Sequence, residues 1–216
     1  MGEVIRDPFR LPRFVLELRR EGVTDEAVLG ALEAVPRDRF VEEYARHLAF
    51  SNVVLPIPCG QIMPKAVSVA GMVSALDLGG ARDKRVLVIG AGSGYTMAVI
   101  AQLADWVYGV ERYRGLVTYA GKCLEAAGVT NAKLTHGDGL DGWAEAGPFD
   151  RILFTCAVEG VPAPLFSQLS RDGFIVAPIE SDEGQFMRVL RDEDRRGELV
   201  AVTRFLPLTP GVAQVL

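Results

Sequence analysis

A short apolar run that ends in glycine and leads into a helix limits this chain to few folds. Residues 85–90 (RVLVIG) have the composition of a strand buried on both faces, and residues 93–104 have the pattern of a helix. The alternation then continues, with strands predicted at 106–111, 132–137, 149–157 and 173–179 and helices at 114–128 and 162–170. Strands alternating with helices predict an α/β, Rossmann-like fold with a mostly parallel, doubly wound sheet.

The two ends of the chain have other patterns. Apolar spacing predicts helices at 9–20, 24–34 (with Thr24 as N-cap) and 37–46, and a helical stripe continues over 65–78. After residue 184, two strand-like runs flank a charged turn, which predicts a C-terminal antiparallel hairpin. We therefore expect an N-terminal helical cap with an active-site loop at 1–64, and one compact α/β domain at 65–216.

Charge and cysteine content narrow the function classes. The 216 residues carry a net charge of −5, which argues against non-specific nucleic-acid binding. Three cysteines without C-x-x-C spacing and two histidines predict no metal site and a reducing, cytoplasmic setting. The first 14 residues are charged throughout, so no signal peptide is expected. No segment is apolar and long enough to predict a membrane helix.

The glycine-rich stretch 86–95 (VLVIGAGSGY) predicts a nucleoside site. Glycines between a strand and a helix let a ligand approach the backbone. Glu111 ends the next strand, where its carboxylate can accept hydrogen bonds from ribose hydroxyls. The plainer alternative is a structural turn followed by a solvated glutamate.

The details of this stretch favour one ligand. Tyr95 occupies the position at which the dinucleotide fingerprint needs a small residue. No lysine follows the glycines, so the phosphate-binding loop is absent as well. A glutamate that binds ribose hydroxyls, which we call the ribose clamp, without a basic residue near the glycines suits a nucleoside ligand that has no phosphate. S-adenosylmethionine is such a ligand. Asp138 and Gly139 follow the third strand at the same sheet edge, where they can bind adenine or simply form a tight turn.

Motifs along most of the chain resemble one family. They are VPRDRFV (35–41), LPIPCGQ (55–61), VLVIGAGSGY (86–95), VYGVER (107–112), HGDGLDGW (136–143), PFDRILFTCA (148–157) and RFLPLTPG (204–211). This combination resembles the protein-L-isoaspartate O-methyltransferase family. The resemblance implies a class I methyltransferase fold, S-adenosylmethionine as donor, and methyl esterification of isoaspartyl residues in damaged proteins, which is a repair reaction.

The resemblance also implies roles for particular residues. The residues implied to contact the donor are Gly90, Gly92, Ser93, Gly94, Glu111, Asp138 and Gly139. The substrate side is implied to include Gln61 and Ala157. No general base is required, because a carboxylate acceptor is already ionised at neutral pH.

The stretch 55–64 (LPIPCGQIMP) departs from the family pattern. Its prolines exclude a helix or a central strand and predict a rigid, irregular loop. After Gln61 the family has Thr-Ile-Ser, whose hydroxyls help to hold the acceptor, whereas this chain has Ile62, Met63 and Pro64 at the catalytic positions.

This departure leaves alternatives open. The chain is either an isoaspartyl methyltransferase, a methyltransferase of the same fold with another acceptor, or a donor-binding protein without turnover. A nicotinamide oxidoreductase is the most distant alternative. The expected partner is a protein or peptide bearing isoaspartate, bound by a monomer, with no nucleic acid and no membrane.

Overall fold

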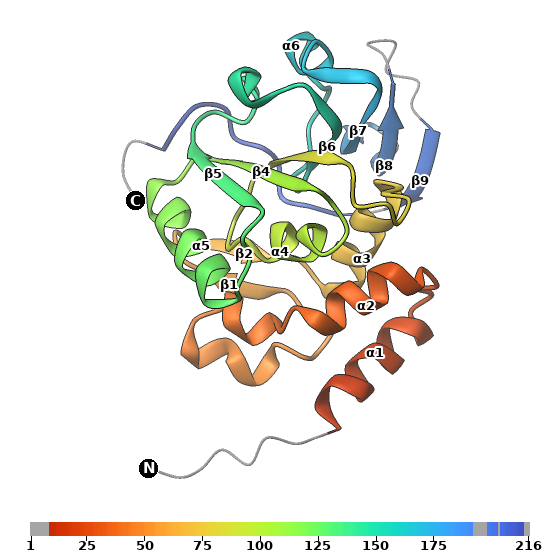
Figure 1. The fold of residues 1–216 in the computed structure, drawn as a ribbon, viewed down its shortest axis with the longest axis vertical. Helices are drawn as coiled ribbons and strands as arrows, with labels where there is room; N and C mark the ends of the chain where they lie inside the picture. The colour runs from red at the N-terminus through yellow and green to blue at the C-terminus, as the bar shows by residue number, and fades with distance from the viewer. Residues whose placement is uncertain (1–8, 192–197, 203, 214–216) are drawn as a thin grey trace.

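A central sheet dominates the computed structural model, which describes residues 9–191, 198–202 and 204–213. In the described residues this sheet has seven strands in the order β5-β4-β3-β6-β7-β8-β9 (Figure 1). Their bounds are β3 Arg85–Ile89, β4 Trp106–Glu111, β5 Ala132–His136, β6 Phe149–Phe154, β7 Leu169–Ser181, β8 Gly184–Leu190 and β9 Glu198–Val202. Strands β3 to β7 pair in parallel, and β8 and β9 are antiparallel. The predicted fold class is therefore confirmed.

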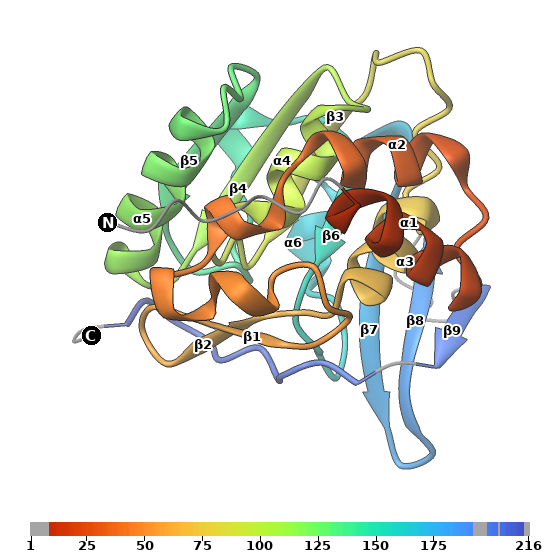
Figure 2. The ribbon, with the colours of Figure 1, turned by 90° about the horizontal axis from the view of Figure 1, so that it is seen from below.

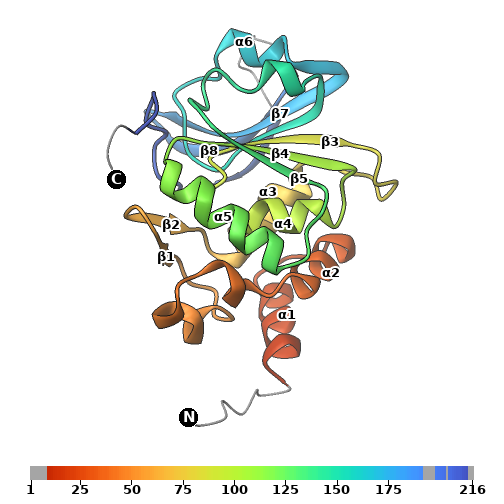
Figure 3. The same ribbon diagram turned by 60° about the vertical axis from the view of Figure 1, so that its left-hand side comes forward.

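The apolar strands are explained by what covers the sheet. Val86 and Val88 of β3 belong to the core on one face, and Leu87 and Ile89 belong to the core on the other. Helices α3 (Ala66–Ala75), α4 (Tyr95–Ala101) and α5 (Arg114–Ala126) cover the first face, and α6 (Ala163–Phe166) lies on the second (Figure 3). Because successive strand residues point to opposite faces, a strand covered on both sides is apolar throughout.

The predicted helix at 162–170 is wrong in length. Helix α6 ends at Phe166, and strand β7 begins at Leu169. Leu169 is paired with Phe149 of β6, so tertiary pairing extends the strand into sequence that has a helical pattern.

The N-terminal segment consists of helices that pack beneath the sheet. Helices α1 (Arg10–Arg20) and α2 (Glu26–Ala34) contribute to the same core as α3 and α4. The N-cap of α2 is Asp25, whose carboxylate accepts from the Val28 N–H at 3.1 Å, so the assignment of Thr24 was wrong by one residue. The helix predicted at 37–46 is instead two short 3-10 turns, η1 (Arg37–Phe40) and η2 (Glu43–Leu48).

The 55–64 segment folds as a small hairpin rather than as an irregular loop. Strand β1 (Leu55–Ile57) pairs antiparallel with β2 (Gln61–Met63), apart from the central sheet. Pro58, Cys59 and Gly60 join them, and the last two have φ +63° and +64°, the left-handed backbone that tight hairpin turns use. The prolines are compatible with this arrangement because a two-stranded ribbon has only edge strands.

The C-terminal residues return across the carboxyl edge of the sheet. Residues 205–211, which we name the C-terminal strap, lie on the same side of the molecule as the hairpin β1–β2 (Figure 2). The strap brackets Ala157, whose N–H donates to the Leu206 carbonyl at 2.8 Å and whose carbonyl accepts from the Leu208 N–H at 2.7 Å. No helix among the described residues is long and apolar enough to cross a membrane.

Candidate active site

The glycine stretch lies where the strand order reverses. Strand β3 is paired with β4 on one side and β6 on the other, and ligands of doubly wound sheets bind at such a switch point. Gly90 follows β3 at φ +84°, and a Cβ added there would lie 2.6 Å from the Thr155 Oγ1. The sequence needs glycine at this position both for its conformation and for the close approach of Thr155, which follows β6.

Two backbone hydrogen bonds fix the Glu111 carboxylate next to the glycine stretch. Its Oε2 accepts from the Gly92 N–H at 2.9 Å and its Oε1 accepts from the Tyr113 N–H at 3.0 Å. The residue is only 5% exposed, so these two bonds satisfy part of a buried charge. Each carboxylate oxygen keeps further lone-pair capacity, which is available to hydroxyl donors in the adjoining cavity.

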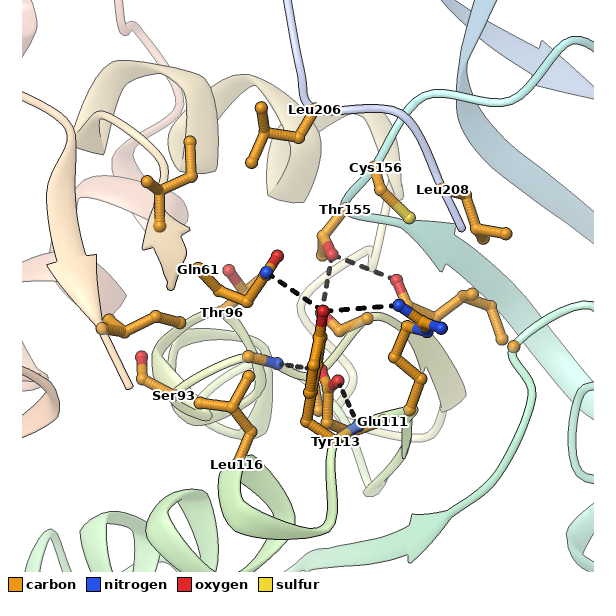
Figure 4. A pocket seen from close by; sticks show the side chains of 18 of the residues that line it. Gln61, Ser93, Thr96, Glu111, Tyr113, Leu116, Thr155, Cys156, Leu206 and Leu208 are labelled. Carbon is orange, nitrogen blue, oxygen red and sulfur yellow. Dashed lines mark hydrogen bonds between the residues drawn. The ribbon is translucent and has the colours of Figure 1, made fainter. Parts of the chain in front are cut away.

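A cavity opens from this glutamate towards the hairpin and the strap (Figure 4). The empty space between the atoms that line it, including the open mouth, is about 1000 Å³. Of the predicted site residues, the following line it: Gln61, Ile62, Met63, Pro64, Gly90, Gly92, Ser93, Glu111 and Gly139.

Three predicted site residues lie outside the cavity lining. Gly94 caps α4 at φ +85°, and an added Cβ there would meet Leu124 at 3.2 Å. Ala157 is buried beneath the strap. The Asp138 carboxylate does not line the cavity and binds two backbone N–H groups. Its Oδ1 accepts from the Leu140 N–H at 2.9 Å, and its Oδ2 accepts from the Gly211 N–H at 2.6 Å.

Comparison with known proteins identifies the family. The sequence model described as Protein-L-isoaspartate(D-aspartate) O-methyltransferase (PCMT) matches residues 11–213. The chain belongs to this family. The predicted resemblance and the predicted S-adenosylmethionine-dependent O-methyltransferase activity are thereby confirmed, and the alternatives with another acceptor or without turnover find no support in the comparisons.

Individual PCMT relatives cover nearly the whole chain. The protein-L-isoaspartate O-methyltransferase of Yersinia enterocolitica is 40% identical over 204 residues, which are 94% of this chain and 97% of that protein. The protein of the same name from Vibrio atlanticus is 39% identical over 203 residues, covering 94% and 95% of the two chains.

Solved structures agree on the fold. One protein-L-isoaspartate O-methyltransferase superposes with a TM-score of 0.80 at 26% identity, covering 91% of this chain, which spans 65% of that one. A Plasmodium falciparum protein described by the same activity, in complex with S-adenosyl-L-homocysteine, has a TM-score of 0.75 at 21% identity, covering 91% of this chain and 97% of that one.

The cavity also contains residues to which the sequence analysis assigned no role. Arg112 and Tyr113, on the turn between β4 and α5, both line the cavity. Figure 4 shows the Tyr113 side chain beside Gln61. The Arg112 guanidinium donates from Nε to the Gly211 carbonyl at 2.9 Å and from NH1 to the Tyr113 hydroxyl at 3.4 Å. Their place directly after Glu111 was the available signal, because the residues that follow an acidic strand end lie at the same sheet edge.

The residues directly after β6 and the strap complete the lining. The Thr155 Oγ1 lies 2.6 Å from the Gly90 carbonyl and 3.1 Å from the Ile89 carbonyl, so its single proton is shared between backbone acceptors. Cys156 follows it in the lining, where burial and then the charge of Glu111 raise the pKa of the thiol to about 12. The thiol is therefore neutral at physiological pH and serves as a small apolar wall.

The hairpin is anchored from beneath by a buried arginine. Arg37 is 0% exposed, and its guanidinium donates to four backbone carbonyls, those of Ala49, Ser51, Val53 and Pro64. The bond from NH2 to the Pro64 carbonyl measures 2.6 Å. Burial lowers the pKa of Arg37, although such a guanidinium still remains protonated. This contact fixes the end of the hairpin that lines the cavity.

Proposed function

We propose that the donor lies between Glu111 and the glycine stretch. The support is the one cavity wall on which Glu111, Gly90, Gly92 and the hydroxyls of Ser93 and Thr96 come together. Neither of those hydroxyls makes a hydrogen bond to another described residue, so both are available to the amino-acid end of the donor. Glu111 would accept from the ribose hydroxyls.

Gly139 and Asp138 would have separate roles in the same site. Gly139 lines the cavity and would lie against the adenine, since a side chain there would collide with Ile89. Asp138 would not contact the donor. Its bond to the Gly211 N–H would instead keep the strap in place over the donor. Gly94 would support the site by starting α4 at the required left-handed conformation.

The acceptor would enter between the hairpin and the strap, against Gln61 and residues 62–64. When bound, S-adenosylmethionine supplies a methyl group on a cationic sulfonium. An ionised carboxylate needs no proton removed, so the chain has to align it, exclude water and hold its charge. Met63 and Cys156 provide apolar walls for this purpose, and no group of three or more metal-ligating side chains occurs among the described residues.

We further propose that the substrates are damaged proteins that bear L-isoaspartate, and that the chain repairs them as a cytoplasmic monomer. The family supports the substrate class. The net charge of −5 and the three unpaired cysteines support a reducing, nucleic-acid-free setting. The cap (residues 1–64) and the domain (residues 65–216) would act as one unit, since α1, α2 and the sheet share a continuous core.

The decisive experiment compares two peptides that differ at one linkage. Radiolabelled methyl transfer would be measured to an L-isoaspartyl peptide and to its normal aspartyl twin. We expect transfer to the isoaspartyl peptide alone, as a base-labile methyl ester. Equal transfer to both peptides, or none to either with donor binding intact, would refute the proposed acceptor.

A further inference from the structure

Positions 62–64 of the hairpin carry no side-chain hydrogen-bond donor, whereas the family pattern that the chain resembles has hydroxyls there. The side chains of Ile62 and Met63 are apolar, and Pro64 has no N–H. The Pro64 carbonyl is an acceptor and is already bound by Arg37. A carboxylate needs donors, so this stretch cannot hold the acceptor charge by its side chains.

Most other polar side chains beside the hairpin are already committed. Glu111 offers only acceptors and would repel a second carboxylate. Gln61 Nε2 donates to the Cys59 carbonyl at 3.2 Å and to the Tyr113 hydroxyl at 3.5 Å, which uses both of its protons. The proton of Thr155 lies between two backbone carbonyls.

Apart from the Ser93 and Thr96 hydroxyls, assigned above to the donor, and the exposed Thr209 of the strap, the Tyr113 hydroxyl is the exception. Its oxygen accepts from Gln61 Nε2 at 3.5 Å and from Arg112 NH1 at 3.4 Å, so two donors face its lone pairs. Its own proton makes no hydrogen bond to another described residue. Figure 4 shows the phenol extending from the β4–α5 turn into the cavity towards Gln61. The remaining proton is therefore available to a ligand in the cavity.

The neighbouring guanidinium strengthens this donor. A hydroxyl that accepts from a cation is polarised and becomes a better donor itself. Arg112 also places positive charge near the hydroxyl, which favours an anionic acceptor over a neutral one. The backbone N–H of Tyr113 donates to Glu111, so the residue is anchored at its base.

We propose that Tyr113, polarised by Arg112, holds the acceptor carboxylate in place of the absent hairpin hydroxyls. This inference rests on the proposed acceptor. It assigns to the turn after β4 a task that the family pattern assigns to positions 62–64. Tyr113 would contact the carboxylate directly, whereas Arg112 would be a positioning residue.

The test is Tyr113→Phe, which removes one oxygen and keeps the ring. We expect kcat/KM for the isoaspartyl peptide to fall about 10- to 100-fold, as for loss of a hydrogen bond to a charged group. The Kd of S-adenosylmethionine and the melting temperature should stay unchanged. Tyr44→Phe is the matched control, since Tyr44 is exposed and lies outside the cavity lining.

A second variant separates the possible roles. Combining Tyr113→Phe with Ile62→Thr and Pro64→Ser restores hydroxyls to the hairpin, and we expect part of the lost kcat/KM to return. A fall in donor affinity with an unchanged KM for the peptide would overturn the proposal, because Tyr113 would then belong to the donor site. Unchanged kcat/KM in Tyr113→Phe would overturn it as well.

Binding of a fluorescent isoaspartyl peptide to protein loaded with S-adenosylhomocysteine gives a readout that does not depend on turnover. If the wild type binds this peptide better than its aspartyl twin while Tyr113→Phe does not, the proposal is supported. If the wild type transfers methyl to neither peptide, the proposed function fails. If it transfers normally and Tyr113→Phe binds the peptide as well as the wild type, only the role of Tyr113 fails.

Discussion

Replacing Glu111 by glutamine tests the proposed donor site most directly. The substitution keeps the shape of the side chain and replaces one carboxylate oxygen by an NH₂ group. In the wild type, each carboxylate oxygen of Glu111 accepts from a backbone N–H group, that of Gly92 at 2.9 Å and that of Tyr113 at 3.0 Å. Whichever way the new amide is oriented, its NH₂ group faces one of these N–H groups, and that bond is lost.

The magnitude follows from the bonds that change. On the donor side, one ribose hydroxyl loses its acceptor and the other loses the charge of its partner. A hydrogen bond to a charged group contributes about 1.5–3 kcal/mol, so we expect the Kd of S-adenosylmethionine to rise about 100-fold. The fold itself should lose about 1–3 kcal/mol, because one buried N–H is left without an acceptor. Glu111→Ala removes both acceptors and should weaken binding further.

The assay is titration calorimetry with the donor, together with urea unfolding of each variant. Glu125→Gln is the matched control, because Glu125 is an exposed residue of α5 outside the cavity, and its Kd should equal that of the wild type. A folded Glu111→Gln protein that binds the donor within about threefold of the wild type would refute the ribose clamp; a threefold change in Kd is under 1 kcal/mol.

Three further predictions concern the hairpin, its anchor and the buried thiol. Ile62→Thr with Pro64→Ser should raise kcat/KM for the isoaspartyl peptide at unchanged donor Kd; no gain would mean that the missing hydroxyls do not limit activity. Arg37→Met should cost about 3 kcal/mol or more in urea unfolding, since four carbonyls lose their donor, whereas Arg39→Met at the exposed surface should cost under about 0.5 kcal/mol. Because burial raises the pKa of Cys156 from 9.0 to about 12, its thiolate fraction at pH 8 should be about a thousandfold lower than that of an ordinary thiol. Peptide-mapped iodoacetamide labelling should accordingly be slow at pH 8 and rise tenfold per pH unit; fast labelling at pH 8 would contradict the shift.

Much of the fold was predictable because its signals are local. Strand β4 lies at Trp106–Glu111, as the apolar run indicated, and β3 ends one residue before the predicted glycine. The glycine stretch requires a backbone that other residues adopt only with strain, so its position was visible in the sequence. Where the sequence pattern fitted both a helix and a strand, strand pairing decided the secondary structure. Leu169 belongs to β7 because it pairs with Phe149 of β6.

The proposed donor side of the cavity was easier to predict than the proposed acceptor side. Gly90, Gly92 and Glu111 belong to one strand–turn–helix–strand unit, whose geometry follows from the fold. The proposed acceptor side is assembled from the hairpin, the turn after Glu111 and the strap. The prolines of the hairpin indicated its rigidity but not the positive φ of Cys59, which closes it as a turn.

The sequence by itself determined the fold class, the family and the glycine–Glu111 pair, because periodicity and glycine placement act over a few residues. Only the tertiary structure decided what Asp138 and Arg112 contact. Asp138 binds the N–H of Gly211, 73 residues away, and Arg112 binds the Gly211 carbonyl at a separation of 99 residues. Contacts of such separation leave no periodic trace in the chain, since they depend on where the strap returns across the sheet edge. The same return brings the strap, the hairpin and Tyr113 into one cavity lining, so the proposed acceptor side emerges only from the folded molecule.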